Sequence, residues 1–281
     1  MTSFISQLSN QQVANLTTAQ MSHLNTTDIQ ALTVTKIGVL SATQINSLLP
    51  ADTTALNALT TTQITGFSPK AVAGLSIGVI LALSSSQGDG EITAFSTSQI
   101  EVLSTTALNS LASTDFQSLS TTQSGALTAT QIGGLTQATL GNLTATQLSG
   151  LTTAQTRGLT TGQLNAMTST LIEGLTASNL STAQIAGLST TAAVNLTTTQ
   201  IGAMSGTQIA SLSAAALSNL SSTELQGLST TQSGALTATQ IGGLSQTGLG
   251  NLSTTQLFAL TSTQTESLTT TEITTLQNLE G

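Results

Sequence analysis

Residues 180–188 read Leu180-Ser181-Thr182-Ala183-Gln184-Ile185-Ala186-Gly187-Leu188, and this eight-residue unit decides the fold. The pattern Leu-[Ser/Thr]-x-x-Gln-Ile-x-x recurs along nearly all of the 281 residues. Leucine or a substitute stands at every eighth position from Leu8 to Leu48, from Leu59 to Leu83, from Phe95 to Leu175 and from Leu180 to Leu276. A fixed short period of this kind indicates a stack of repeated units.

Neither a continuous helix nor a plain strand fits an eight-residue period. Eight helical residues advance by about 800°, so a leucine stripe would drift around the helix by about 80° per repeat. In a strand, the leucine and the isoleucine five residues later would face opposite sides. Each octad must therefore restart its own short element.

The octad carries the signals of a helix start. Ser181 stands where an N-cap is expected, and Gln184 three residues later completes a capping box. Leu180 and Ile185 then form a hydrophobic staple across the cap. Glycine often follows the isoleucine, where the helix must end and turn. Pro69 directly follows the cap residue Ser68, and the first helical position is the one that proline prefers.

A single octad cannot fold alone. Burying two large apolar side chains contributes roughly 4 kcal/mol, whereas ordering eight residues costs about 12 kcal/mol. Stacked octads that share an interior can fold. We therefore predict one all-α solenoid over residues 1–281, built of one- to two-turn helices with leucine and isoleucine inside. The alternative is a β-solenoid with two octads per coil and threonine lining one face.

The octad register breaks near residues 49–51, 84–87 and 176–180. A longer repeat lies over the short one, because Leu119-STTQSGALTATQIGG-Leu135 returns as Leu228-STTQSGALTATQIGG-Leu244. We expect each break to re-aim the superhelix or to form a surface loop. Composition does not change toward either end, so we expect uncapped ends that stack between chains.

Composition excludes several function classes. The chain holds 3 Lys and Arg against 11 Asp and Glu, a net charge of −8. Nucleic acids and anionic membrane surfaces need clustered cations, and Lys36, Lys70 and Arg157 are scattered. The absence of cysteine excludes disulfides. The apolar fraction of 38% is too high for a solvated disordered chain.

No segment has the pattern of a cleavable signal or of a membrane span. Residues 1–8 lack a basic start and a continuous apolar stretch. The apolar run at residues 71–83 is shorter than the ~20 residues that a spanning helix needs. We therefore expect a soluble protein, and any export would use another route.

No candidate residue indicates catalysis, a metal or a cofactor. His23 is the single histidine, and we expect it at a solvent-facing variable position. Residues 88–91, Gly-Asp-Gly-Glu, lack the spacing of oxygen ligands in a calcium loop and predict a tight turn. Four acids fall at helix-capping positions, where a carboxylate stabilises a helix start: Asp28, Asp52, Glu224 and Glu272. The many serines and threonines have no neighbouring base to activate them.

The octads Leu196-TTTQIGA-Met204 and Leu252-STTQLFA-Leu260 carry a family resemblance. They are similar to the octad repeats of long bacterial surface and secreted proteins that are described as adhesin-like. The resemblance covers most of the chain and implies an exported, extracellular or cell-surface protein. The chain lacks the glycine- and aspartate-rich calcium nonapeptides common in such proteins.

These observations favour a non-enzymatic structural protein that self-assembles into an extracellular filament, sheath or surface layer. Its expected partners are further copies of itself, stacked end to end, and a cell surface to which the assembly attaches. The alternative is a secreted adhesin, for which Phe258 and Arg157 are too isolated to form a recognition face. A third hypothesis, ice binding by a flat threonine array, requires the β-solenoid.

Overall fold

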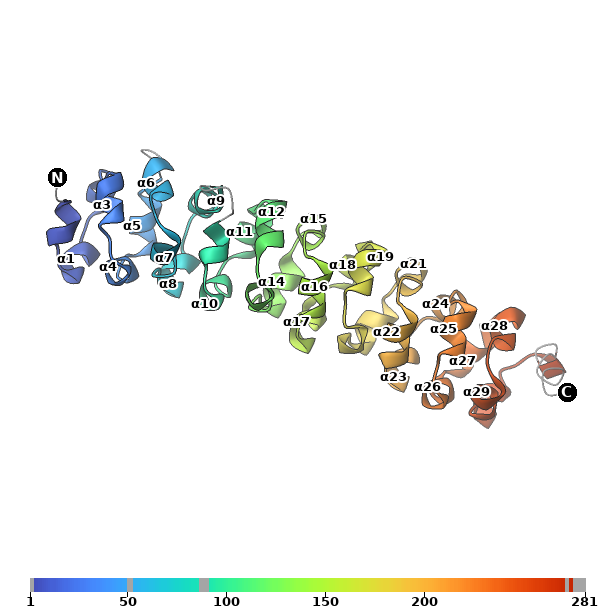
Figure 1. The fold of residues 1–281 in the computed structure, drawn as a ribbon. Coiled ribbons are helices and arrows are strands. Elements are labelled where there is room, and N and C mark those ends of the chain that lie inside the picture. The colour runs from blue at the N-terminus through green and yellow to red at the C-terminus, as the bar shows by residue number, and fades with distance from the viewer. Residues whose placement is uncertain (1–2, 50–52, 86–90, 271–272, 275–281) are drawn as a thin grey trace. The chain divides into compact units, whose positions relative to one another are not determined.

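A computed structural model describes residues 3–49, 53–85, 91–270 and 273–274, and its regular elements there are all helices. Figure 1 shows the chain as a succession of short coiled ribbons without an arrow in this part. The predicted all-α solenoid of one- to two-turn helices is confirmed. The β-solenoid alternative is wrong, because the regular elements of the described residues are all helices. The ice-binding hypothesis, which requires the β-solenoid, loses its premise.

The chain forms two compact units, residues 1–143 and 144–281. The first unit holds η1 (Phe4–Gln7), α1 (Asn10–Ala14), α2 (Thr18–Met21), α3 (Thr26–Gln30), α4 (Val34–Gly38), α5 (Ala42–Asn46), α6 (Thr53–Asn57), α7 (Thr61–Ile64), α8 (Pro69–Ala73), α9 (Ile77–Ser85), η2 (Glu91–Ala94), α10 (Thr97–Ile100), α11 (Thr105–Ser110), α12 (Ser113–Ser118), α13 (Thr121–Ser124), α14 (Ala129–Gly134) and α15 (Gln137–Leu140).

The second unit continues with the same kind of element. It holds α16 (Ala145–Ser149), α17 (Thr153–Gly158), α18 (Thr161–Ala166), α19 (Ser169–Glu173), η3 (Ala177–Asn179), α20 (Thr182–Ala186), α21 (Thr190–Ala193), α22 (Thr198–Ala203), α23 (Gly206–Ile209), α24 (Ala214–Ser218), α25 (Ser222–Gln226), α26 (Thr230–Ala235), α27 (Ala238–Gly242), α28 (Gln246–Gly250), α29 (Thr254–Phe258) and α30 (Ser262–Thr265). One continuous solenoid over residues 1–281 stays a prediction.

Capping boxes start most of the helices, as predicted. In α20, the Ser181 Oγ accepts the backbone N–H of Gln184 at 3.2 Å, and the Gln184 Oε1 accepts the backbone N–H of Ser181 at 2.8 Å. Pro69 occupies the first turn of α8, after the cap residue Ser68. Because such short helices leave most of their end groups without intrahelical partners, the caps decide whether they form at all.

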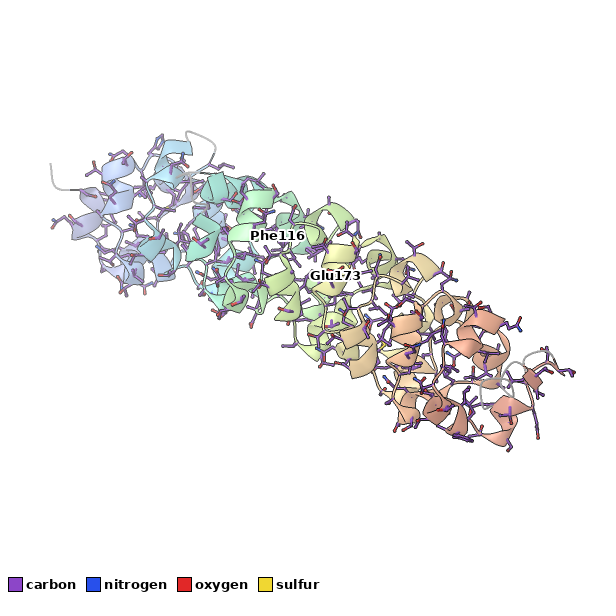
Figure 2. All side chains as sticks on the ribbon, turned by 45° about the vertical axis from the view of Figure 1, so that its right-hand side comes forward. Phe116 and Glu173 are labelled. Atoms are coloured by element: carbon purple, nitrogen blue, oxygen red, sulfur yellow. The ribbon has the colours of Figure 1, made fainter. Side chains whose placement is uncertain are left out.

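The interior is formed by the leucine before each cap and the isoleucine at the fourth helical position. Leu180 is 2% exposed and Ile185 is fully buried. Phe116 takes the isoleucine position in α12 and is also fully buried, whereas Glu173 at the end of α19 is exposed (both are labelled in Figure 2). The predicted shared core of leucine and isoleucine is therefore confirmed.

Each helix packs against the third helix along the chain. In the first unit, α2 contacts α5 and α3 contacts α6, and in the second unit α23 contacts α26 and α24 contacts α27. Three helices therefore complete one turn of the solenoid. This number could not be read from the octads themselves.

Glycines at the helix ends permit a close approach between turns. The helices end there as predicted, but Gly174 and Gly187 at the C-caps of α19 and α20 have φ of −71° and −88°, which any residue adopts. A Cβ added at Gly174 would lie 2.9 Å from the Cα of Ala145, the first residue of α16 in the preceding turn. A Cβ at Gly187 would lie 2.6 Å from the Cγ2 of Thr161, the first residue of α18.

The substitution Gly174→Ala is therefore expected to destabilise the fold, by about 1–3 kcal/mol, because the added methyl meets backbone that cannot rotate away. Gly202, inside α22, has nothing within 4 Å of its added Cβ, and Gly202→Ala should stabilise by about 0.5–1 kcal/mol through helix propensity. Urea unfolding of the two variants measures both changes. If both substitutions changed the free energy of unfolding equally and in the same direction, close packing would not be the reason for glycine at position 174.

Candidate functional site

Among the described residues, the glutamine of the octad makes a polar contact between turns that recurs along the chain. In α26, the Gln232 Oε1 accepts the backbone N–H of its own cap residue, Ser229, at 2.8 Å. The Gln232 Nε2 donates to the backbone oxygens of Ile201 and Met204 in the preceding turn, both at 2.8 Å. One buried amide thus closes its own helix and ties that helix to the turn before it.

The same amide interlock recurs within both units. The Nε2 atom donates to the carbonyl of the leucine, or its substitute, one turn earlier at 2.6–2.9 Å in Gln44, Gln63, Gln99, Gln123, Gln131, Gln184, Gln200, Gln208, Gln232, Gln240 and Gln256. Gln264 makes the same bond to Leu236. A buried carbonyl left without a donor would cost about 1–3 kcal/mol, so each amide removes a penalty as well as adding a bond.

The interlock fixes the size of a turn. Gln232 and its acceptor Met204 are 28 residues apart, and glutamine stands four residues after the leucine of its own octad. The remaining 24 residues are three octads, in agreement with the packing of every third helix.

The register breaks change the length of a turn but not its contacts. Across residues 49–51, of which 50 and 51 lie outside the described residues, the separation from Gln63 to Leu32 is 31 residues. Across residues 84–87, of which 86 and 87 are not described, it is 32 residues, from Gln99 to Phe67. Where η3 replaces a full octad at residues 176–180, it falls to 25, from Gln184 to Leu159.

Three asparagines also tie neighbouring turns together, but they reach toward the following turn, whereas the glutamines reach toward the preceding turn. Each asparagine donates from Nδ2 to a glycine carbonyl in the following turn and accepts, at Oδ1, the N–H of the next cap residue. The trios are Asn46 with Gly74 and Ser76, Asn109 with Gly134 and Thr136, and Asn165 with Gly187 and Ser189, all at 2.8–3.0 Å. The helices capped by Ser76, Thr136 and Ser189 have Val79, Thr139 and Ala192 in place of the capping-box glutamine. The asparagine Oδ1 therefore accepts the cap residue's N–H, which the glutamine Oε1 accepts in other octads.

Asn57 holds the same octad position as these asparagines, but its Oδ1 is buried without a hydrogen-bond partner. The regular spacing would give it the backbone N–H of Ser84, as Asn109 receives that of Thr136 over 27 residues. Ser84 lies inside α9, which runs on to Ser85. The backbone N–H of Ser84 therefore belongs to the hydrogen bonding within α9 and is not offered to Asn57.

Lys36 and Glu224, which stand at the glutamine position, each retain only half of the interlock. The Lys36 Nζ donates to the carbonyl of Ile5 at 2.8 Å over 31 residues, the separation from Gln44 to Val13. An ammonium group accepts nothing, and α4 has no capping box. Conversely, the Glu224 carboxylate accepts the N–H and the Oγ–H of Ser221 at 2.7 and 2.8 Å, but has no donor for the preceding turn.

The structure does not gather the other candidate residues into a site. His23 is exposed, Lys70 is exposed in α8, and the Arg157 Nε donates to the carbonyl of Asn179 at 3.4 Å. Asp28 and Glu224 lie in capping boxes, as predicted. Asp52, Glu272 and residues 88–90 of the predicted tight turn lie outside the described residues. In the part of the chain that the structure describes, no three His, Cys, Asp or Glu side chains could jointly hold a metal ion.

Sequence reasoning missed the second half of the interlock. It assigned glutamine to the capping box, where a glutamate would serve equally well. The signal was the strong preference for Gln over Glu at this position, because only the amide can also donate. The asparagine contacts carry no comparable signal, because they appear in just a few octads.

No protein-family model matches the chain, and no curated protein resembles it closely enough to count as a relative. Among the described residues, the helices are all too short or too polar to cross a membrane.

The interlock predicts that Gln232→Glu destabilises the fold by about 3 kcal/mol or more at neutral pH, because a buried carboxylate would face two carbonyl oxygens. The deficit should shrink at acid pH, where the carboxyl is protonated and can donate. Urea unfolding at several pH values measures it, with Gln226→Glu, at an exposed position in α25, as the control. If Gln232→Glu and Gln226→Glu had the same free energy of unfolding at neutral pH, the interlock would not contribute to stability.

Proposed function

We propose that this chain is a non-enzymatic structural protein that self-assembles into an extracellular filament, sheath or surface layer. The observation that carries the proposal is the direction of the amide interlock. Each interlocking glutamine donates toward the preceding turn, as Gln232, Gln240 and Gln256 donate to the carbonyls of Met204, Leu212 and Leu228. Any turn of this kind therefore offers donors on one side and acceptors on the other.

Such a directional stack suits a polymer. A contact between unlike faces leaves one face open on each molecule, so it extends into a filament when the rotation between copies does not close a ring. The contact uses neutral amides and backbone carbonyls, so it needs no pairing of opposite charges between copies. The resemblance to bacterial surface repeats supports an extracellular place for the assembly and its attachment to a cell surface.

The adhesin alternative finds less support in the described residues. Phe258 is 77% exposed on α29, and no other large apolar side chain of the second unit is exposed to that extent. Arg157 bonds to the backbone of η3. Neither residue forms a grouped recognition surface.

Electron microscopy of the purified full-length chain, in negative stain and without a partner, tests the proposal. We expect uniform thin filaments whose length increases with protein concentration. Sedimentation of the same samples should show growing species. Short particles of monomer mass at every concentration would contradict the proposal and would direct attention to a ligand.

A further inference from the structure

The Asn57 Oδ1 is an exception among the buried side-chain polar atoms of the described residues, because it has no hydrogen-bond partner. Buried polar atoms in folded proteins are nearly always paired, so an unpaired one needs a physical reason. Asn109 holds the same octad position and makes two bonds at 2.9 Å, from Nδ2 to the carbonyl of Gly134 and from the N–H of Thr136 to Oδ1. We call this pair of bonds the asparagine clasp, and Asn57 lacks its second bond.

The groups that would complete a clasp with Asn57 lie on α9. The clasp of Asn109 spans 25 residues to the carbonyl and 27 residues to the N–H. Counted from Asn57, the same separations lead to Ala82 and Ser84. The helix that carries Asn57, α6, packs against α9, just as α5, which carries the clasping Asn46, packs against α8. The spacing and the packing therefore both place the end of α9 within the scheme that the other asparagines follow.

The helix α9 continues through the residues at which the octad pattern would start a new cap. Leu83 and Ser84 stand eight residues after the leucine and the cap serine of the previous octad. The helix nevertheless runs for nine residues, Ile77–Ser85, and the Ser84 Oγ donates to the carbonyl of Leu81 at 3.0 Å. Serine side chains that bond to nearby backbone compete with helix continuation and favour caps. The segment therefore has the sequence signals of two different local structures.

We propose that the last turn of α9 is a two-state element. In one state the helix extends to Ser85, and in the other it ends at Ala82, where Asn57 accepts the N–H of Ser84 and donates to the carbonyl of Ala82. The shorter helix spans six residues, the length of α14, whose last residue takes part in the clasp of Asn109. The element lies within the first unit, so it goes beyond the proposed assembly and does not depend on it.

The two states exchange hydrogen bonds of similar kind. The long helix keeps the Ser84 N–H within α9 and leaves a buried acceptor on Asn57 without a donor, which is penalised. The short helix gives up bonds of its last turn and pairs that acceptor. Leu83 is fully buried in the long helix, and Leu135, which precedes the cap Thr136, is also buried. The core thus stays filled in both states, as expected for a local opening at a helix end.

A single fluorine label tests the element, because the chain has no cysteine of its own. In the full-length chain, Leu81→Cys places a thiol at an exposed position of α9, where a trifluoromethyl tag can be attached. The ¹⁹F spectrum of this tagged chain then reports the state of the last turn of α9.

Two further substitutions in the tagged chain fix one state each. Asn57→Leu removes the clasp and should fix the long helix. Ser85→Pro should fix the short helix, because proline removes a helical N–H and forces the residue before it out of the helical region. The chain already uses this arrangement at α8, where Ser68 precedes Pro69 as an extended cap residue.

We expect two ¹⁹F resonances from the tagged chain, or one resonance between the positions of the two fixed variants, and a single resonance from each fixed variant. Asn165→Leu, which removes a clasp in the second unit, should leave the spectrum unchanged. Circular dichroism confirms that each variant is folded. A tagged chain whose single resonance coincides with that of either fixed variant would overturn the two-state element, and so would loss of one state in Asn165→Leu.

Discussion

The structure depends on one side-chain amide, that of the glutamine which recurs in more than half of the octads. An isolated helix of four to six residues is unstable in water, and a helix of this length ends before most of its carbonyls find partners. The octad glutamine stabilises both ends of this arrangement. Its Oε1 accepts the N–H of the cap residue, and its Nε2 donates to backbone carbonyls of the preceding turn. Gln232, with three such bonds at 2.8 Å, shows the arrangement at its most regular.

The local structure could be predicted from the sequence because its causes lie within five residues. The cap at Ser181, the box with Gln184 and the burial of Ile185 all follow from one octad. The number of octads per turn could not, because it is set by a contact 28 residues away, as between Gln232 and Met204.

The irregular octads show what the interlock tolerates. Insertions and a shortened octad change the separation to 31, 32 or 25 residues, while the same donor reaches the same kind of carbonyl. The contact therefore fixes positions and leaves loop length free. Lys36 and Glu224 each preserve the half of the contact that their chemistry permits.

Glu224 gives the most direct measurement of the central claim, because it is a natural octad without the donor. The substitution Glu224→Gln should add a bond to the carbonyl of Leu196, 28 residues earlier, and stabilise the fold by about 0.5–1.5 kcal/mol in urea unfolding. Glu173→Gln removes the same charge at an exposed site and should change stability little. A Glu224→Gln variant no more stable than this control would contradict the interlock.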